Sequence, residues 1–165
     1  MAVVNRVVTE NLGNDIIISA DTIVSLGDHI LEKPDSKAHA MEMLAQLSGR
    51  EHSVFTAVTI AVRRELLPLT LEGYDADERS SPDYRFKTFL TRTAVQFAVL
   101  SPVTIQGYVD SEEPMDKAGS YGIQGIGASL VEGIRGDYFN VVGFPVRNFA
   151  VELNRLLESM FSNQT

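Results

Sequence analysis

The chain has 165 residues and an ordinary globular composition, which fits one domain over residues 1–165. Its lack of cysteine excludes disulfides and thiolate metal sites, and no apolar run is long enough to span a membrane. The formal net charge of −8 argues against broad binding to nucleic acid, because such binding needs basic patches. Any site for a phosphate must therefore gather local lysines, arginines, backbone N–H groups or a divalent cation.

The N-terminal part is predicted to form a helix, a strand and a hairpin. Valines on one face predict a helix over 2–10. Residues 16–20 are nearly all apolar and predict a short strand buried on both faces, which ends at Asp21-Thr22. A Gly-Asp turn then predicts a small hairpin over 23–31. The N-terminus is too polar for a secretory signal, and we expect a cytoplasmic protein.

In the middle of the chain, a helix is expected to start at 34–36, where an Asp or Ser can cap it, and Ser48-Gly49 is expected to end it. Alternating polar and apolar residues predict strands over 51–62 and 86–100. The segment between them, 63–83, is rich in charge and is interpreted as a hairpin or a mobile insert.

The C-terminal part begins with a helix over 101–109, where Ser-Pro provides the start. A segment rich in glycine and charge follows at 112–127, and short strands are expected at 128–134 and 138–142. An amphipathic helix is predicted from Pro145 onward. The mixture predicts the α/β class, with a mixed, twisted sheet and flanking helices.

Asp21 and Lys33 are the first candidates for chemistry. A carboxylate at the end of a strand, as predicted for Asp21, can bind Mg²⁺ or accept a proton from water, although it can equally cap the following turn. Lys33 precedes Pro34, which restricts the lysine to an extended conformation. It can hold phosphate charge, or it can be an ordinary surface lysine.

The segment 108–127 is the densest feature of the sequence. Its glycines allow the backbone to approach a ligand closely, and their N–H groups can form an anion-binding concavity. Gln124 offers a donor and an acceptor, which suits the edge of a base. Lys117 is a candidate for binding substrate and Glu113 for binding metal. The alternative is an irregular surface loop, since the P-loop and dinucleotide-binding patterns are both absent.

The remaining charged and ionisable residues carry weaker signals. The histidines are scattered without a metal-ligand spacing, and we interpret all of them as structural or surface residues. Arg63 and Arg64 are interpreted as solvated charges.

Five segments carry a resemblance to a known family, and together they are highly specific because they occur in that family's order with fitting spacings. They are 18–24, 31–34, 47–56, 113–125 and 136–145. The chain resembles the Maf family of nucleotide pyrophosphatases over nearly its whole length, apart from roughly 61–85. The resemblance implies a two-lobed α/β fold shared with inosine-triphosphate pyrophosphatases, homodimers, and a reaction supported by Mg²⁺ or Mn²⁺.

The resemblance also implies roles for single residues. Asp21 matches the proposed general base and is a candidate metal ligand together with Glu113. Lys33 matches a phosphate-contacting lysine, and Thr22 and Gln124 match positions linked to base selection. The pattern is similar to the branch that hydrolyses dTTP and UTP, and by extension modified pyrimidine nucleotides, to monophosphate and pyrophosphate. We expect a nucleoside triphosphate as substrate, and neither nucleic acid nor a membrane as partner.

One departure from the family pattern opens an alternative. Family members usually begin with a strand and a Ser-x-Ser-Pro-Arg-Arg loop whose arginines grip the triphosphate, and this sequence has no such loop. We therefore expect an N-terminally truncated form of the fold. The alternative function is a catalytically impaired nucleotide-binding or scaffold protein.

Overall fold

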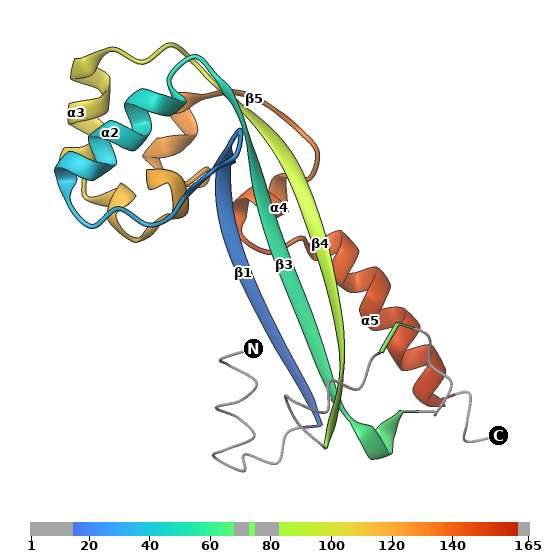
Figure 1. Cartoon of the computed structure of the whole chain (residues 1–165). Coiled ribbons are helices and arrows are strands. Elements are labelled where there is room, and N and C mark those ends of the chain that lie inside the picture. The colour runs from blue at the N-terminus through green and yellow to red at the C-terminus, as the bar shows by residue number, and fades with distance from the viewer. Residues whose placement is uncertain (1–14, 68–72, 75–82, 162–165) are drawn as a thin grey trace. The chain divides into compact units, whose positions relative to one another are not determined.

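The computed structural model describes residues 15–67, 73–74 and 83–161 (Figure 1). The helix predicted over 2–10 lies outside the described residues. The same is true of 68–72 and 75–82 in the predicted insert over 63–83. None of the described helices is both long and apolar enough to cross a lipid bilayer.

A five-stranded antiparallel sheet with flanking helices forms the fold, in the order β2-β1-β3-β4-β5 (Figure 1). The predicted α/β class with helices beside a sheet is therefore confirmed, while the parallel pairs of a mixed sheet are not among the described strands. The predicted hairpin is also present, with Val24 opposite Leu31. The strands are β1 (Ile16–Leu26), β2 (His29–Leu31), β3 (Glu51–Arg63), β4 (Tyr84–Phe97) and β5 (Val131–Arg135).

Polar side chains start the helices where the sequence indicates. The Ser36 side chain accepts a hydrogen bond from the backbone N–H of His39 at 3.1 Å, and Ser101 accepts one from Thr104 at 3.1 Å. The α-helices are α2 (Lys37–Leu47), α3 (Pro102–Asp110), α4 (Tyr138–Val142) and α5 (Val146–Phe161). Short 3₁₀ turns are η1 (Arg64–Leu66), η2 (Glu113–Asp116), η3 (Ala118–Ser120) and η4 (Ile126–Leu130).

The first strand differs from its prediction in length and in burial. β1 does not end at Asp21 but continues to Leu26, and Ile18 is 42% exposed, so the strand is not buried on both faces. Polar side chains do not end a strand whose backbone pairs with its neighbours, because the side chains lie above and below the sheet and leave the ladder intact.

The segment 138–142, predicted as a strand, is the helix α4. The Asp137 side chain accepts the Phe139 N–H at 2.9 Å, and Gly143 ends the helix with a φ of 118°. Capping at both ends therefore outweighs the strand preference of the aromatic and β-branched residues between them. The neighbouring prediction, 128–134, is partly correct, since η4 precedes β5.

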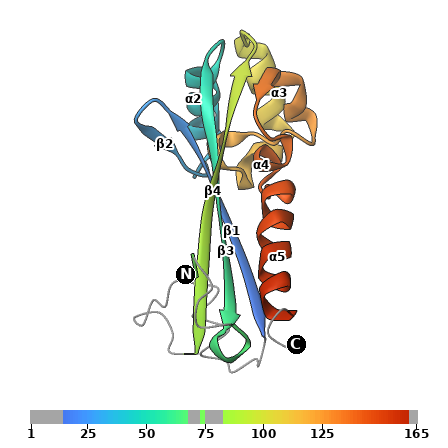
Figure 2. The ribbon, with the colours of Figure 1, turned by 90° about the vertical axis from the view of Figure 1, so that its right-hand side faces the viewer.

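The chain divides into two compact units. The first takes its described residues from 1–21, 57–90 and 146–165. Its main core joins the strands to α5, which lies along them (Figure 2). Lys87 and Glu152 form an ion pair of 3.5 Å between β4 and α5. The buried core residues are Ile60, Val62, Leu67, Tyr74 and Leu156.

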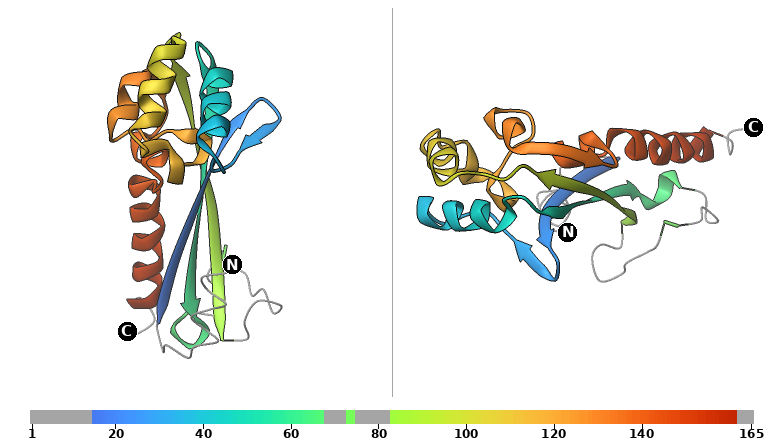
Figure 3. Two further views of the ribbon diagram at one scale, coloured as in Figure 1. Left: turned by 90° about the vertical axis from the view of Figure 1, so that its left-hand side faces the viewer. Right: turned by 90° about the horizontal axis from the view of Figure 1, so that it is seen from above.

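The second unit comprises 22–56 and 91–145. Its helices α2 and α3 lie side by side and pack on the strands of this unit (Figure 3). The 3₁₀ turns η2 and η3 contact α2, so the glycine-rich segment is anchored on the same core. The most deeply buried side chains here include Leu44, Leu47, Val54, Phe97 and Val109.

Candidate functional site

The chain around Lys33 is held against the η3 turn in the second unit. The backbone N–H of Gly119 donates to the Glu32 carbonyl at 3.1 Å. Gly119 has a φ of +68°, and a Cβ at this position would lie 2.9 Å from the Val24 side chain. The close approach of η3 to the hairpin therefore requires glycine at this position. It brings the predicted site residues Lys33 and Lys117 into one region.

Lys117 pairs with a carboxylate in this region, and Lys33 lies near the same carboxylate. Lys117 Nζ forms an ion pair with Asp116 Oδ1. The hydrogen bond and charge of Lys117, followed by the charge of Lys33, lower the pKa of Asp116 below its usual value. The charge of Lys117 also acts on Glu113, so Lys33 and Lys117 lie near the two carboxylates of Asp116 and Glu113. The two lysines are the positive charges that an anionic ligand would meet in this region.

Glu113 organises the loop that follows. Its carboxylate accepts hydrogen bonds from the backbone N–H groups of Ile126 at 2.8 Å and Gly127 at 3.0 Å. A Cβ on Gly125 would overlap this carboxylate. Glycine at position 125 therefore lets the loop close over Glu113 without displacing this carboxylate.

Tyr108 ties the other side of the loop to the same carboxylate. Its hydroxyl donates to Glu113 Oε1 at 3.1 Å and accepts from the Gly122 N–H at 3.1 Å. Burial raises the pKa of Tyr108, so the hydroxyl stays protonated and available as a donor. Burial works to raise the pKa of Glu113 as well, but the donors of Gly127, Ile126 and Tyr108 outweigh it and lower the pKa.

Gln124 is exposed, and it follows the buried Ile123 and precedes the exposed Gly125. Within the described part of the chain, its side chain makes no hydrogen bond. The Lys117 Cε atom lies 3.2 Å from the position of a Cβ on Gly122, at the start of the loop. The Gln124 amide therefore lies on a loop that Lys117 contacts at its start. Glu113 holds the backbone of this loop through the N–H groups of Ile126 and Gly127.

Thr22 belongs to a hydrogen-bond network. Its Oγ1 lies 2.9 Å from Oγ1 of Thr56, which also donates to the Asn140 carbonyl at 3.1 Å. Thr56 and Asn140 are fully buried, whereas Thr22 is partly exposed. Sequence reasoning missed Thr56 and Asn140 as single residues, although both lie in segments that carry the family resemblance.

Asp21 is exposed and directly precedes Thr22 in β1. Among the residues described, no hydrogen bond or ion pair joins Asp21 to Lys33, Lys117 or Gln124. Its predicted role as general base stays a prediction.

The candidate metal ligands differ in how well they fit a cation. Both carboxylate oxygens of Glu113 already accept hydrogen bonds, which suits the organisation of a loop better than the binding of metal. Asp21 has an exposed carboxylate, and Mg²⁺ often binds through one or two carboxylates together with substrate phosphates. In the ranges 15–67, 73–74 and 83–161, no group of three or more His, Asp or Glu side chains could hold a metal.

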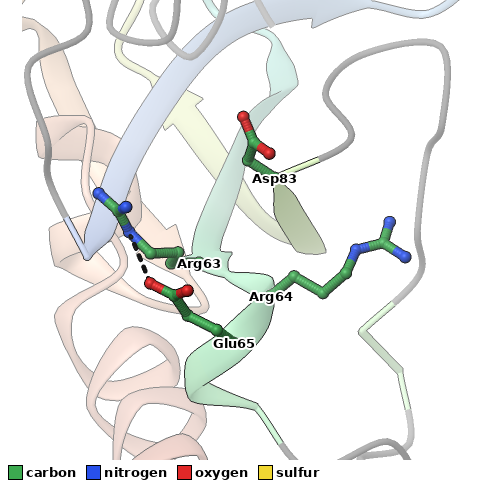
Figure 4. A pocket seen from close by; sticks show the side chains of 4 residues that line it. All are labelled: Arg63, Arg64, Glu65 and Asp83. Atoms are coloured by element: carbon green, nitrogen blue, oxygen red, sulfur yellow. Dashed lines mark ion pairs between the residues drawn. The ribbon is translucent and has the colours of Figure 1, made fainter.

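A pocket of about 330 Å³ lies in the first unit and contains none of the predicted site residues (Figure 4). Arg63 Nε lies 3.5 Å from Asp15 and 3.7 Å from Glu65, so this arginine is paired and not simply solvated. The Arg64 side chain points away from Arg63, and its backbone N–H donates to the Asp83 carbonyl at 2.7 Å (Figure 4). The mixture of acids and bases gives this pocket no clear preference for an anion.

Comparison with known proteins supplies the family. The sequence model of the family described as "Maf-like protein" matches residues 2–156. A human "Probable bifunctional dTTP/UTP pyrophosphatase/methyltransferase protein" is 45% identical over 157 residues, which are 94% of this chain and 23% of the human protein.

Two bacterial relatives have a sequence identity to the chain close to that of the human protein. A "dTTP/UTP pyrophosphatase" of Bacillus anthracis (strain CDC 684 / NRRL 3495) is 42% identical over 90% of this chain and 67% of its own length. One of Moorella thermoacetica (strain ATCC 39073 / JCM 9320) is 45% identical over 86% of this chain and 63% of its own length. The chain thus spans about two thirds of these bacterial relatives and under a quarter of the human one. Since the family pattern extends over residues 2–156, the chain belongs to the Maf-like protein family.

Proposed function

We propose that the protein hydrolyses dTTP and UTP to the monophosphate and pyrophosphate, and that modified pyrimidine nucleotides are further substrates. The names of the similar proteins support this proposal. The observation that carries it is the proximity of Lys33 to the Lys117–Asp116 pair, beside the glycine loop on which the Gln124 side chain makes no hydrogen bond with any described residue. Cations and an exposed amide suit a nucleotide, which has phosphates at one end and a base at the other.

In this proposal, Lys33 and Lys117 bind the phosphates, and Gln124 and Thr22 contact the base. Asp21 orients a water molecule and takes its proton as the water oxygen attacks the α-phosphorus. The bond between the α-phosphorus and the bridging oxygen breaks, and pyrophosphate leaves with both electrons of that bond. The lysines stabilise the charge that develops on the phosphate oxygens.

We also propose that the reaction uses Mg²⁺ or Mn²⁺. Such a cation supplies polarisation of the phosphate oxygens when it is bound together with the substrate. Of the predicted ligands, the exposed carboxylate of Asp21 fits this role. A homodimer in the cytoplasm completes the proposal, on the basis of family resemblance.

The first test is release of pyrophosphate from dTTP and UTP by the full chain, with Mg²⁺ or Mn²⁺. Asp21→Asn keeps the shape of the side chain but cannot accept the proton, and we expect kcat to fall about 100-fold or more. Asp28→Asn is the matched control, because Asp28 is an exposed acid in the turn of the β1–β2 hairpin. Full activity of Asp21→Asn would reject the assignment of the base. Nucleotide binding without turnover by the unmodified chain would reject the proposed activity.

A further inference from the structure

A chain of hydrogen bonds in the second unit has one exposed end. It runs from the carbonyl oxygen of Asn140 to Thr56 Oγ1 at 3.1 Å, and from there to Thr22 Oγ1 at 2.9 Å. Asn140 and Thr56 each have 0% exposure, whereas Thr22 is partly exposed. At the exposed end, the Thr22 hydroxyl is the group that can form a hydrogen bond with a ligand.

Counting protons determines the direction of this chain. A threonine hydroxyl has one proton and can also accept, whereas a carbonyl oxygen can only accept. Thr56 must therefore donate its proton to Asn140, and Thr22 must donate its proton to Thr56. If Thr56 donated to Thr22 instead, oxygen lone pairs of Thr56 and Asn140 would face each other in a fully buried place, which is costly.

The acceptor at the buried end is held firmly. The Asn140 side chain donates through Nδ2 to the Val54 carbonyl at 3.0 Å and to Thr93 Oγ1 at 3.1 Å. Thr93 Oγ1 in turn donates to the Asp137 carbonyl at 2.9 Å and accepts from the Asp137 N–H at 3.1 Å. Asn140 therefore cannot turn away from Thr56 without breaking its side-chain bonds to Val54 on β3 and to Thr93 on β4.

We infer that Thr56 and Asn140 are positioning residues that hold Thr22 as a pure hydrogen-bond acceptor, so that Thr22 selects a pyrimidine with an N–H donor at ring position 3. Uracil and thymine carry that proton, whereas the same nitrogen of cytosine is an acceptor and would meet the Thr22 lone pairs. This inference rests on the proposed function only in requiring that a nucleotide base lies at Thr22. Mismatched hydrogen-bonding groups discriminate strongly, because a buried group is left unpaired.

The test compares binding of UMP and CMP to the full chain by isothermal titration calorimetry. Thr56→Val keeps the side-chain shape but removes the acceptor, so Thr22 becomes free to turn its proton toward the ligand. We expect the preference for UMP over CMP to fall about fivefold to tenfold, the size of one neutral hydrogen bond. Thr56→Ser retains the hydroxyl and should restore the preference.

Thr59→Val is the matched control. Thr59 lies on β3 like Thr56, and its Oγ1 also pairs with a threonine, at 2.8 Å from Thr88 Oγ1. It has no link to Thr22, so the preference for UMP should be unchanged. An unchanged preference in Thr56→Val, or an equal loss in Thr59→Val, would overturn the inference. Wild-type chain that binds CMP as well as UMP, or binds neither, would overturn it too.

Thr22→Val provides a second route if Thr56→Val does not fold. It removes the acceptor itself at a partly exposed position, and it should reduce the UMP preference to the same extent. Retention of the full preference in Thr22→Val would rule the inference out. Pyrophosphate release from UTP is measured separately, so that an inactive chain that still prefers UMP would reject the enzymatic proposal and leave the role of Thr22 standing.

Discussion

The Glu113 side chain connects Tyr108 at the start of the glycine-rich segment with Ile126 and Gly127 at its end. Its carboxylate accepts hydrogen bonds from Ile126, Gly127 and Tyr108, and Tyr108 accepts one from Gly122. Gln124 lies between these anchored positions. A single carboxylate thereby joins three parts of the loop that carries Gln124.

Glu113→Gln should loosen this loop. The substitution replaces one acceptor oxygen by an NH₂ group that faces N–H donors, and leaving a donor unpaired costs about 1–3 kcal/mol. We expect faster hydrogen exchange at the Ile126 and Gly127 amides, measured by mass spectrometry, and weaker binding of UTP. Glu112→Gln is the control, because Glu112 is exposed and its carboxylate pairs only with Lys37 at 3.3 Å among the described residues. Equal exchange rates in wild type and Glu113→Gln would show that other contacts hold the loop.

Thr56 and Asn140 illustrate what sequence reasoning could not reach at the level of residues. The bonds that make them important connect Thr56 to Thr22 and to Asn140 across 34 and 84 positions of the chain. A local sequence pattern does not predict these hydrogen bonds, because they depend on which elements pack against one another in the folded protein. Lys33, Lys117 and Gln124, in contrast, could be proposed from their chemical type and their proximity to glycine or proline.

At the scale of elements, the η3 turn places the lysine cluster by docking on the β1–β2 hairpin. The turn approaches closely enough that Gly119 lies against Val24, and its N–H donates to the Glu32 carbonyl. The position of Lys117 relative to Lys33 thus depends on backbone contact between two elements that are far apart in sequence.

Gly119→Ala should disturb this docking. Alanine at a φ of +68° costs about 1–2 kcal/mol, and overlap of its Cβ with Val24 adds roughly 1–3 kcal/mol. We expect a loss of about 2–5 kcal/mol in the free energy of unfolding, measured with urea, and a higher KM for UTP. Gly133→Ala is the control, since a Cβ there has no atom within 4 Å. The docking argument fails if the two variants have the same stability.

The helices and strands were predicted correctly where the capping residues and the spacing of apolar residues indicate the same element. Serine caps and apolar faces predicted α2 and α3, and alternation predicted β3 and β4. The prediction failed for 138–142, where aromatic and β-branched residues favour a strand but Asp137 and Gly143 cap a helix. It failed at the end of β1 because pairing with neighbouring strands extends a strand through polar residues.

At the scale of the whole molecule, a buried histidine links the stability of the fold to pH. His52 is 3% exposed, its Nε2 lies 2.8 Å from the Tyr121 hydroxyl, and its ring packs edge-on to Phe97. Burial lowers the pKa of His52 to about 4 from an ordinary value of 6.5. The unfolded chain therefore binds a proton at this residue at a higher pH than the folded protein does.

Stability should consequently fall as pH decreases from about 6.5 to about 4, by up to roughly 3 kcal/mol from this residue. Urea unfolding at several pH values, for wild type and His52→Phe, measures this contribution as the difference between the slopes. Tyr121→Phe removes the hydroxyl partner but leaves the histidine buried, and it should keep the wild-type slope. A His52→Phe variant whose stability changes with pH as steeply as that of wild type would contradict the prediction.

The sequence by itself determined the α/β class, most of the helices and strands, the family and the candidate residues, because these depend on residue type and short-range spacing. Only the tertiary structure decided that Glu113 organises a loop, that Lys117 pairs with Asp116 near Lys33, and that Thr22 is joined to the buried Thr56. The physical reason is that hydrogen bonds and charges act through space. Which donor meets which acceptor is settled when distant segments pack against one another, and not before.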